Sequence, residues 1–288
     1  MKHLNLFIEL TRLKKPIGYM LLYWPCLWGL TLVYDFNNEI YTYTKYLVFF
    51  LLGSILMRSA GCIVNDIIDK KFDKKVERTK NRPIASGQVS TSLALVYTLV
   101  LCFFAFLVLI NFNLLTIILA LASMPLAFTY PLMKRFTYWP QLFLGITFNY
   151  GLILAWASIN NDISITPILF YFGAIFWTLG YDTIYGYQDI KDDEIIGVKS
   201  TSIKFKNNPK SFLIICYSVF FASLIIIGIL MKFSNFFYLT LLIPFWHLFF
   251  YQIKLLNTKV PENCLKLFKS NNILGLILCT NILIGKFF

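Results

Sequence analysis

The chain has 288 residues, of which 58% are hydrophobic and only 14% are charged. A soluble domain of this size carries about 25% charged residues and needs a polar surface, so hydrocarbon must cover much of this chain. The formal net charge is +12, but the basic residues lie in short segments between apolar runs. That pattern is typical of membrane orientation and argues against nucleic acid as a partner.

The apolar runs predict the fold. A helix needs about 20 apolar residues to cross the hydrocarbon core, and runs without alternating polarity exclude β-barrel strands. The sequence therefore predicts an all-α integral membrane protein with one transmembrane domain over residues 1–288. We expect nine transmembrane helices, at residues 17–34, 46–66, 92–111, 113–131, 139–158, 166–187, 211–231, 236–253 and 270–287.

The distribution of Lys and Arg predicts the orientation. Twenty-two of the 26 basic residues lie in the N-terminal segment or after spans 2, 4, 6 and 8. The opposite side holds three, Lys45, Lys232 and Lys286, and Arg58 lies within span 2. This asymmetry predicts a cytoplasmic N-terminus. No cleavable signal or Arg- and Ser-rich transit segment precedes the first span, which favours a bacterial inner (cytoplasmic) membrane.

Three aspartates end the second span. Asp66, Asp69 and Asp73 are spaced i, i+3 and i+7, which stacks them on one face of a helix. Such carboxylates repel each other unless a cation joins them, and Mg²⁺ prefers hard oxygen ligands of this kind. Asn65 adjoins the same face and adds a neutral donor and acceptor. The pattern predicts a metal site; a solvated charged helix end is the alternative.

Arg58 precedes Asp66 by eight residues on roughly the same helical face, about 12 Å deeper in the membrane. A guanidinium at that depth needs a carboxylate partner. Three partners are consistent with the sequence: Asp182, a purely structural carboxylate, or the carboxylate of a bound substrate.

A second acidic cluster follows at the end of span 6. Asp182, Tyr185, Asp189 and either Asp192 or Asp193 are expected on one helical stripe. Asp182 lies inside a transmembrane segment, where an ionisable residue is costly and marks function. The cluster lies four spans after the first, so both are expected at the cytoplasmic face.

Basic residues follow each acidic cluster, and we single out Arg78, Arg82, Lys191 and Lys199. Metal-binding carboxylates beside Lys and Arg make a site for a diphosphate. The chain has no GxxxxGK[ST] motif for ATP. With an apolar cavity in the bilayer, such a site fits a lipid diphosphate.

These motifs resemble those of the UbiA-type membrane prenyltransferases. Residues 65–73 resemble the first aspartate-rich motif of that family, and residues 182–193 resemble the second. Further segments resemble the members that act on 4-hydroxybenzoate, at residues 12–18, 24–25, 57–62, 77–83, 130–141 and 197–201. Lys14 and residues 206–208 depart from the family pattern, and the last three spans resemble it only in hydrophobicity.

The resemblance implies nine helices around a central cavity, Mg²⁺ as cofactor, and transfer of a polyprenyl chain from a polyprenyl diphosphate to 4-hydroxybenzoate in ubiquinone biosynthesis. It implies Mg²⁺ ligation by Asp66, Asp69, Asp73, Asp189 and Asp193. Catalytic roles are expected for Asp66, Asp69, Asp182, Tyr185 and Asp189, and substrate binding for Arg58, Asn65, Arg78, Arg82, Lys191 and Lys199.

Two other functions remain open from the residues. A related enzyme would use another aromatic acceptor, such as a naphthoate in menaquinone synthesis or a haem. A secondary transporter would also carry intramembrane charges, but usually near the midplane in broken helices. Arg58 and the segment 130–141 favour hydroxybenzoate as the acceptor.

Overall fold

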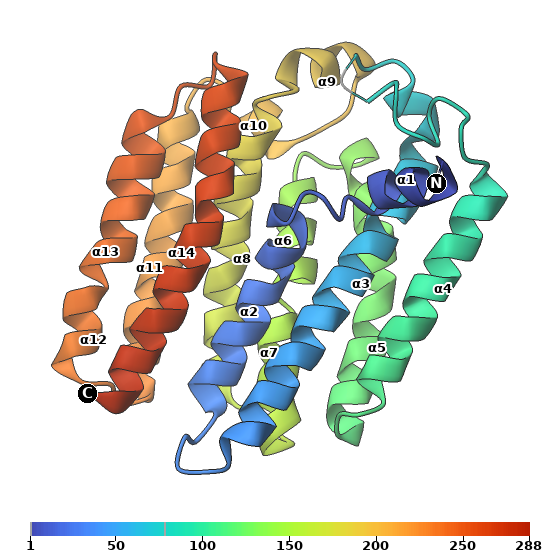
Figure 1. Ribbon diagram of the computed structural model, residues 1–288. Coiled ribbons are helices and arrows are strands. Elements are labelled where there is room, and N and C mark those ends of the chain that lie inside the picture. Colours follow the sequence, from blue (N-terminus) through green and yellow to red (C-terminus); the bar gives the residue numbers. More distant parts are fainter. Residues whose placement is uncertain (1, 78) are drawn as a thin grey trace.

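The computed structural model describes residues 2–77 and 79–288, and this part of the chain folds as a bundle of helices without a strand (Figure 1). The predicted all-α membrane class is confirmed. The elements are α1 (Lys2–Thr11), α2 (Ile17–Val33), α3 (Ile40–Asp73), α4 (Thr91–Leu109), α5 (Leu114–Thr129), η1 (Tyr130–Arg135), α6 (Pro140–Phe148), α7 (Gly151–Asn160), α8 (Ile165–Gly186), α9 (Ile190–Ile196), α10 (Thr201–Lys204), α11 (Pro209–Leu230), α12 (Asn235–Thr240), α13 (Leu242–Trp246), η2 (His247–Lys254) and α14 (Pro261–Phe287).

Each of the nine predicted spans falls on helix. Within the described residues, seven helical stretches are long and apolar enough to cross a membrane. They are Ile40–Asp73, Thr91–Leu109, Leu114–Arg135, Pro140–Asn160, Pro209–Leu230, Asn235–Lys254 and Pro261–Phe287. The other two predicted spans correspond to α2, which is apolar but has only 17 residues, and to α8, which has 22 residues and carries Asp182. The expected number of nine therefore stays a prediction.

Helix α3 is the longest element and runs well past its predicted range of 46–66. Its 34 residues correspond to roughly 50 Å of helix, which exceeds the thickness of the hydrocarbon core. The last turns of α3 therefore reach the end of the bundle where α1, α9 and α10 lie (Figure 1). The N-terminus lies at this end and the C-terminus at the opposite end (Figure 1).

Helix α1 is amphipathic and lies across the end of the bundle (Figure 1). Its buried residues Leu6 and Leu10 pack in one apolar cluster with Ala60 and Ile63 of α3. Arg12 follows with a left-handed backbone (φ 54°), a conformation that residues other than glycine rarely adopt. The turn ends α1 and directs the chain into α2.

A buried aromatic cluster packs α2 against α8, next to α14. The rings of Trp28 (α2) and Trp177 (α8) lie 4.9 Å apart between centroids. Each indole N–H has a partner on α14, because Trp28 donates to the carbonyl of Gly275 (2.9 Å) and Trp177 donates to Asn271 Oδ1 (2.8 Å). The same Asn271 oxygen accepts a hydrogen bond from Gln252 Nε2 of η2 (3.0 Å).

We expect Asn271→Leu to destabilise the protein strongly, because Trp177 and Gln252 would lose their acceptor inside an apolar core. Two unsatisfied buried donors cost about 2–5 kcal/mol. Thermal unfolding in detergent measures the change. Asn272→Leu is the matched control, since the half-buried Asn272 accepts only the Trp24 indole N–H (2.9 Å). Equal melting temperatures for both variants would contradict this role of Asn271.

Candidate active site

Three carboxylates are buried along the end of α3. Asp66, Asp69 and Asp73 lie on this one helix as predicted, and each is exposed by less than a tenth of its surface. Because buried carboxylates are costly unless they are paired, their charges must be compensated by neighbouring groups.

The compensating charges come from segments far apart in the sequence. Arg12 donates to Asp66 Oδ1 at 2.6 Å. Arg82 bridges two of the carboxylates, with 3.1 Å to Asp66 Oδ1 and 2.9 Å to Asp73 Oδ2. Lys134 of η1 donates to Asp69 Oδ2.

Asp69 keeps one oxygen for a further partner. Its Oδ1 atom is buried and accepts no hydrogen bond from the described residues. Arg135 Nη2 lies 3.8 Å from this oxygen and donates instead to the carbonyl of Ile68 (2.8 Å). A buried carboxylate oxygen without a donor is the kind of atom that a ligand or a metal ion would satisfy.

The spatial arrangement of the second acidic cluster differs from the prediction. Asp182 and Tyr185 lie on α8, but that helix ends at Gly186. Asp189 lies in the turn that follows, and Asp193 lies in the first turn of the separate helix α9. The single stripe predicted for these residues is therefore wrong.

At the end of α8 the backbone hydrogen bonds shorten from a four-residue to a three-residue spacing. The N–H groups of Tyr187, Gln188 and Asp189 donate three residues back, to Ile184, Tyr185 and Gly186. Gly186 itself packs closely on α10, where a Cβ atom would lie 2.2 Å from Ser202 Oγ.

Element η1 connects the two acidic segments. Its Lys134 contacts Asp69 of α3 through the ammonium group. The backbone carbonyl of Lys134 accepts a hydrogen bond from the N–H of Lys199 (2.8 Å), which follows α9. Lys134 thus contacts both the first acidic cluster and the segment that follows the second.

Arg58 lies deeper, at a junction of α2, α3 and α6. Its guanidinium lies over the ring of Phe148, with Cζ 5.4 Å from the ring centroid. A Cβ atom at Gly18 would lie 2.9 Å from Arg58 Nε, so glycine gives the guanidinium its space. No ion pair joins Arg58 to an acid among the described residues. Its Nε is buried without a hydrogen-bond partner there.

The remaining predicted residues are placed less centrally. Tyr185 is half-buried, and its ring lies 4.5 Å from that of Phe268. Asn65 is half-buried and Lys191 is exposed. Lys199 donates to the carbonyl of Phe136 at 3.3 Å. Arg78 lies outside the described residues.

Sequence reasoning gave no site role to three residues that contact the carboxylates, namely Arg12, Lys134 and Arg135. All three lie within the segments that resemble the family, so a signal was present. Spacing alone cannot identify them, because Arg12 and Lys134 are 54 and 65 residues from the aspartates that they contact. Burial lowers the pKa of Arg12, but the neighbouring Cys62 and Asp66 raise it, and the net shift is upward, so the guanidinium stays charged.

We expect Lys134→Met to destabilise the protein, because it leaves Asp69 buried without its main counter-charge. Removing one partner of a buried ion pair costs about 3–5 kcal/mol. Lys199→Met is the control, since the ammonium group of Lys199 meets a backbone carbonyl. The free energy of unfolding in mild detergent is the measurement, and a loss no larger than that of the control would contradict the pairing.

Comparisons with known proteins identify the family. The UbiA prenyltransferase family matches residues 22–274. The mitochondrial 4-hydroxybenzoate polyprenyltransferase of Bos taurus is 42% identical over 97% of this chain and 75% of its own length. The 4-hydroxybenzoate octaprenyltransferase of Nitrosomonas eutropha is 39% identical over 96% of both chains.

Solved structures have the same fold. A UbiA homologue from Aeropyrum pernix superposes with a TM-score of 0.74 and 20% identity, covering 93% of this chain and 98% of that one. A homologue from Archaeoglobus fulgidus, bound to GPP and Mg²⁺, superposes with a TM-score of 0.71 and 16% identity, covering 98% of both chains. With a family match over most of its length and relatives near 40% identity, the chain belongs to the UbiA prenyltransferase family.

Proposed function

We propose that this protein transfers a polyprenyl chain from a polyprenyl diphosphate to 4-hydroxybenzoate. The allylic C–O bond of the diphosphate breaks, and a new C–C bond forms at the ring carbon ortho to the hydroxyl. The ring gives up one proton and diphosphate leaves. The product class is a precursor in ubiquinone biosynthesis.

The observation that carries the proposal is the stack of three buried aspartates, paired with Arg12, Arg82 and Lys134 at the end of a membrane bundle. Acids and bases in such close contact are suited to a ligand that carries both cations and anions. A metal diphosphate is such a ligand, and its lipid tail would extend among the helices. The relatives named as 4-hydroxybenzoate prenyltransferases support the same reaction.

The donor set suits Mg²⁺ in kind, because it offers hard carboxylate oxygens and the unpartnered Oδ1 of Asp69. No three acids, His or Cys among the described residues are grouped closely enough to hold a metal ion, since Arg and Lys lie between the carboxylates. We assign the metal to Asp66, Asp69 and Asp73, with Asp189 and Asp193 contributed by the second segment. When bound, Mg²⁺ would neutralise charge that develops on the leaving diphosphate.

The basic residues that pair with the aspartates are also suited to bind the phosphate groups of the substrate. In the structure Arg82 bridges Asp66 and Asp73, and its planar guanidinium suits phosphate oxygens equally well. With Mg²⁺ held by the carboxylates, Arg12, Arg82 and Lys134 would be available to bind phosphate oxygens. Arg78, Lys191 and Lys199 would add positive charge around the same diphosphate.

The acceptor would bind deeper, where Arg58 offers a buried Nε without a partner. Of the three partners considered for Arg58, the carboxylate of the substrate explains this free donor best. Asn65 would help to orient the substrates. Tyr185 would stabilise the allylic cation through its ring, and Asp182 would take the proton that leaves the acceptor.

The remaining parts of the proposal concern the membrane. We propose nine spans, a cytoplasmic N-terminus and an active site that opens to the cytoplasm of a bacterial inner membrane. The position of the two termini at opposite ends of the bundle (Figure 1) and the asymmetry of Lys and Arg support this arrangement.

The decisive assay measures transfer of a labelled polyprenyl chain to 4-hydroxybenzoate by purified protein in liposomes. Product should form with Mg²⁺, vanish with EDTA, and be absent in Asp66→Ala protein that still unfolds cooperatively. Glu77→Gln, at an exposed acid, should keep activity. Product from a naphthoate instead would overturn the acceptor, and none from any aromatic acceptor would favour a transporter.

A second assay tests Arg58. Arg58→Met should raise KM for 4-hydroxybenzoate by about 10- to 100-fold, because a charge-assisted hydrogen bond is lost, while KM for the prenyl diphosphate changes little. Arg58→Lys should recover part of the affinity. An unchanged KM for hydroxybenzoate in Arg58→Met would show that its carboxylate binds elsewhere.

A further inference from the structure

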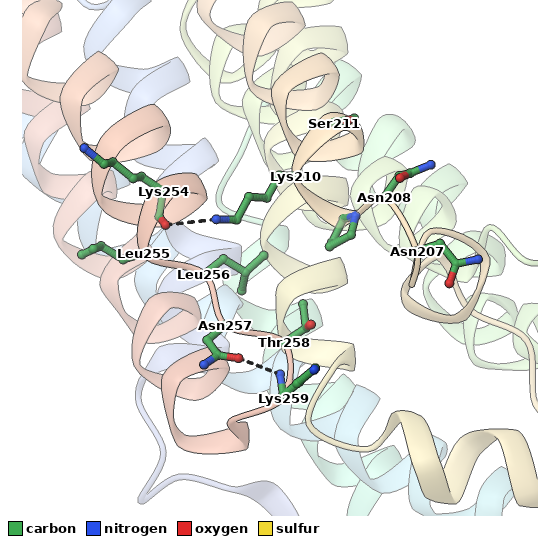
Figure 2. Close-up of a pocket in the computed structure, with 11 residues that line it drawn as sticks. Asn207, Asn208, Lys210, Ser211, Lys254, Leu255, Leu256, Asn257, Thr258 and Lys259 are labelled. Carbon is green, nitrogen blue, oxygen red and sulfur yellow. Dashed lines mark hydrogen bonds between the residues drawn. The ribbon is translucent and has the colours of Figure 1, made fainter.

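A lysine-lined groove lies away from the aspartates, between the segment that starts α11 and the segment that follows η2 (Figure 2). Its volume is about 680 Å³. The lining residues are Asn207, Asn208, Pro209, Lys210, Ser211, Lys254, Leu255, Leu256, Asn257, Thr258 and Lys259. None of the described lining residues is acidic, so the groove carries three formal positive charges.

Hydrogen bonds between side chains and backbone groups connect the residues that line the groove. Lys210 at the start of α11 donates through Nζ to the carbonyl of Lys254 at the end of η2 (3.2 Å), and the side chain of Asn257 accepts the N–H of Lys259 (3.1 Å) (Figure 2). The first contact joins the two segments, and the second stabilises the turn within the segment that follows η2. They use only one of the three ammonium protons of Lys210, and the ammonium groups of Lys254 and Lys259 have no acidic partner among the described residues.

The chemistry of the lining selects an anion with several oxygen acceptors. The groove is lined by Lys210 and Lys259, by Asn207 and Asn208, and by the hydroxyl-bearing Ser211 and Thr258, whereas the ammonium group of Lys254 points away from Lys210 (Figure 2). A phosphate group matches this set of donors.

The surroundings favour a phosphate that belongs to a lipid. The groove lies where two apolar stretches, Pro209–Leu230 and Asn235–Lys254, reach the end of the membrane. Just below it, Ile214 and Ile215 are 47% and 60% exposed, and Leu255 at its edge is 54% exposed. Exposed apolar side chains directly beneath a cationic groove match acyl chains beneath an anionic headgroup.

We infer that this groove binds the phosphate headgroup of an anionic membrane phospholipid, with the acyl chains along the outer face of α11. Lys259 contacts the headgroup oxygens, and Lys210 contacts them while it caps the end of η2. None of the aspartates assigned to the proposed diphosphate site lines this groove.

The test compares lipid retention by two double variants of the whole protein. Lys210→Gln with Lys259→Gln removes two charges from the groove, and the amide introduced at position 210 can still donate to the carbonyl of Lys254. The control, Lys266→Gln with Lys269→Gln, removes two exposed charges from α14 on the same side, outside the lining. Native mass spectrometry in detergent counts retained phosphatidylglycerol against phosphatidylcholine.

We expect wild type and control to retain phosphatidylglycerol preferentially, and the groove variant to lose about tenfold or more in affinity, since each juxtamembrane Lys contributes to anionic lipid binding. Excess inorganic phosphate and diphosphate are titrated as competitors. Equal retention by both variants would overturn the site. Displacement of the lipid by millimolar free phosphate would overturn the lipid in favour of a soluble anion. Because the readout is lipid retention, prenyl transfer tests the proposed function separately.

Discussion

Burial of three like charges on one helix face is the constraint on which the rest of the structure depends. Asp66, Asp69 and Asp73 lie within two turns of α3 and are almost inaccessible. Such carboxylates are stable only if cations approach them directly. The positions of the N-terminal segment, the loop after α3 and η1 follow from that requirement, because each of these segments brings a cation to the stack.

The same constraint explains how the protein can prepare for a ligand. Arg12, Arg82 and Lys134 are held against the aspartates, so the cations that we propose as phosphate ligands already lie beside the carboxylates that we propose as metal ligands on α3. A metal diphosphate would replace pairs between side chains with pairs to the ligand, so no charge would need to be drawn in from solvent. Preassembled charges of this kind lower the cost of reorganisation during reaction.

The C-terminal half has a different internal construction. Here a buried network of neutral groups links Trp177, Asn271, Gln252 and Tyr217 by hydrogen bonds. This network fixes α8, α11, η2 and α14 without ion pairs. The wider π-helical turns of η2 occur here, and such turns are often found near functional positions. The lysine groove at the end of η2 lies on this rigid half, away from the charged stack.

The sequence by itself determined the membrane class, the position of the helices and the face that carries Asp66, Asp69 and Asp73, because hydropathy and helical spacing are local properties. It also singled out Arg58 as a buried charge that needs a partner. Only the tertiary structure decided which cations meet which aspartates, as the distant pairs Arg12–Asp66 and Lys134–Asp69 show. It also decided that α8 ends at Gly186, so that Asp189 leaves the stripe of Asp182. Such contacts depend on how the helices pack, and one-dimensional spacing does not contain that information.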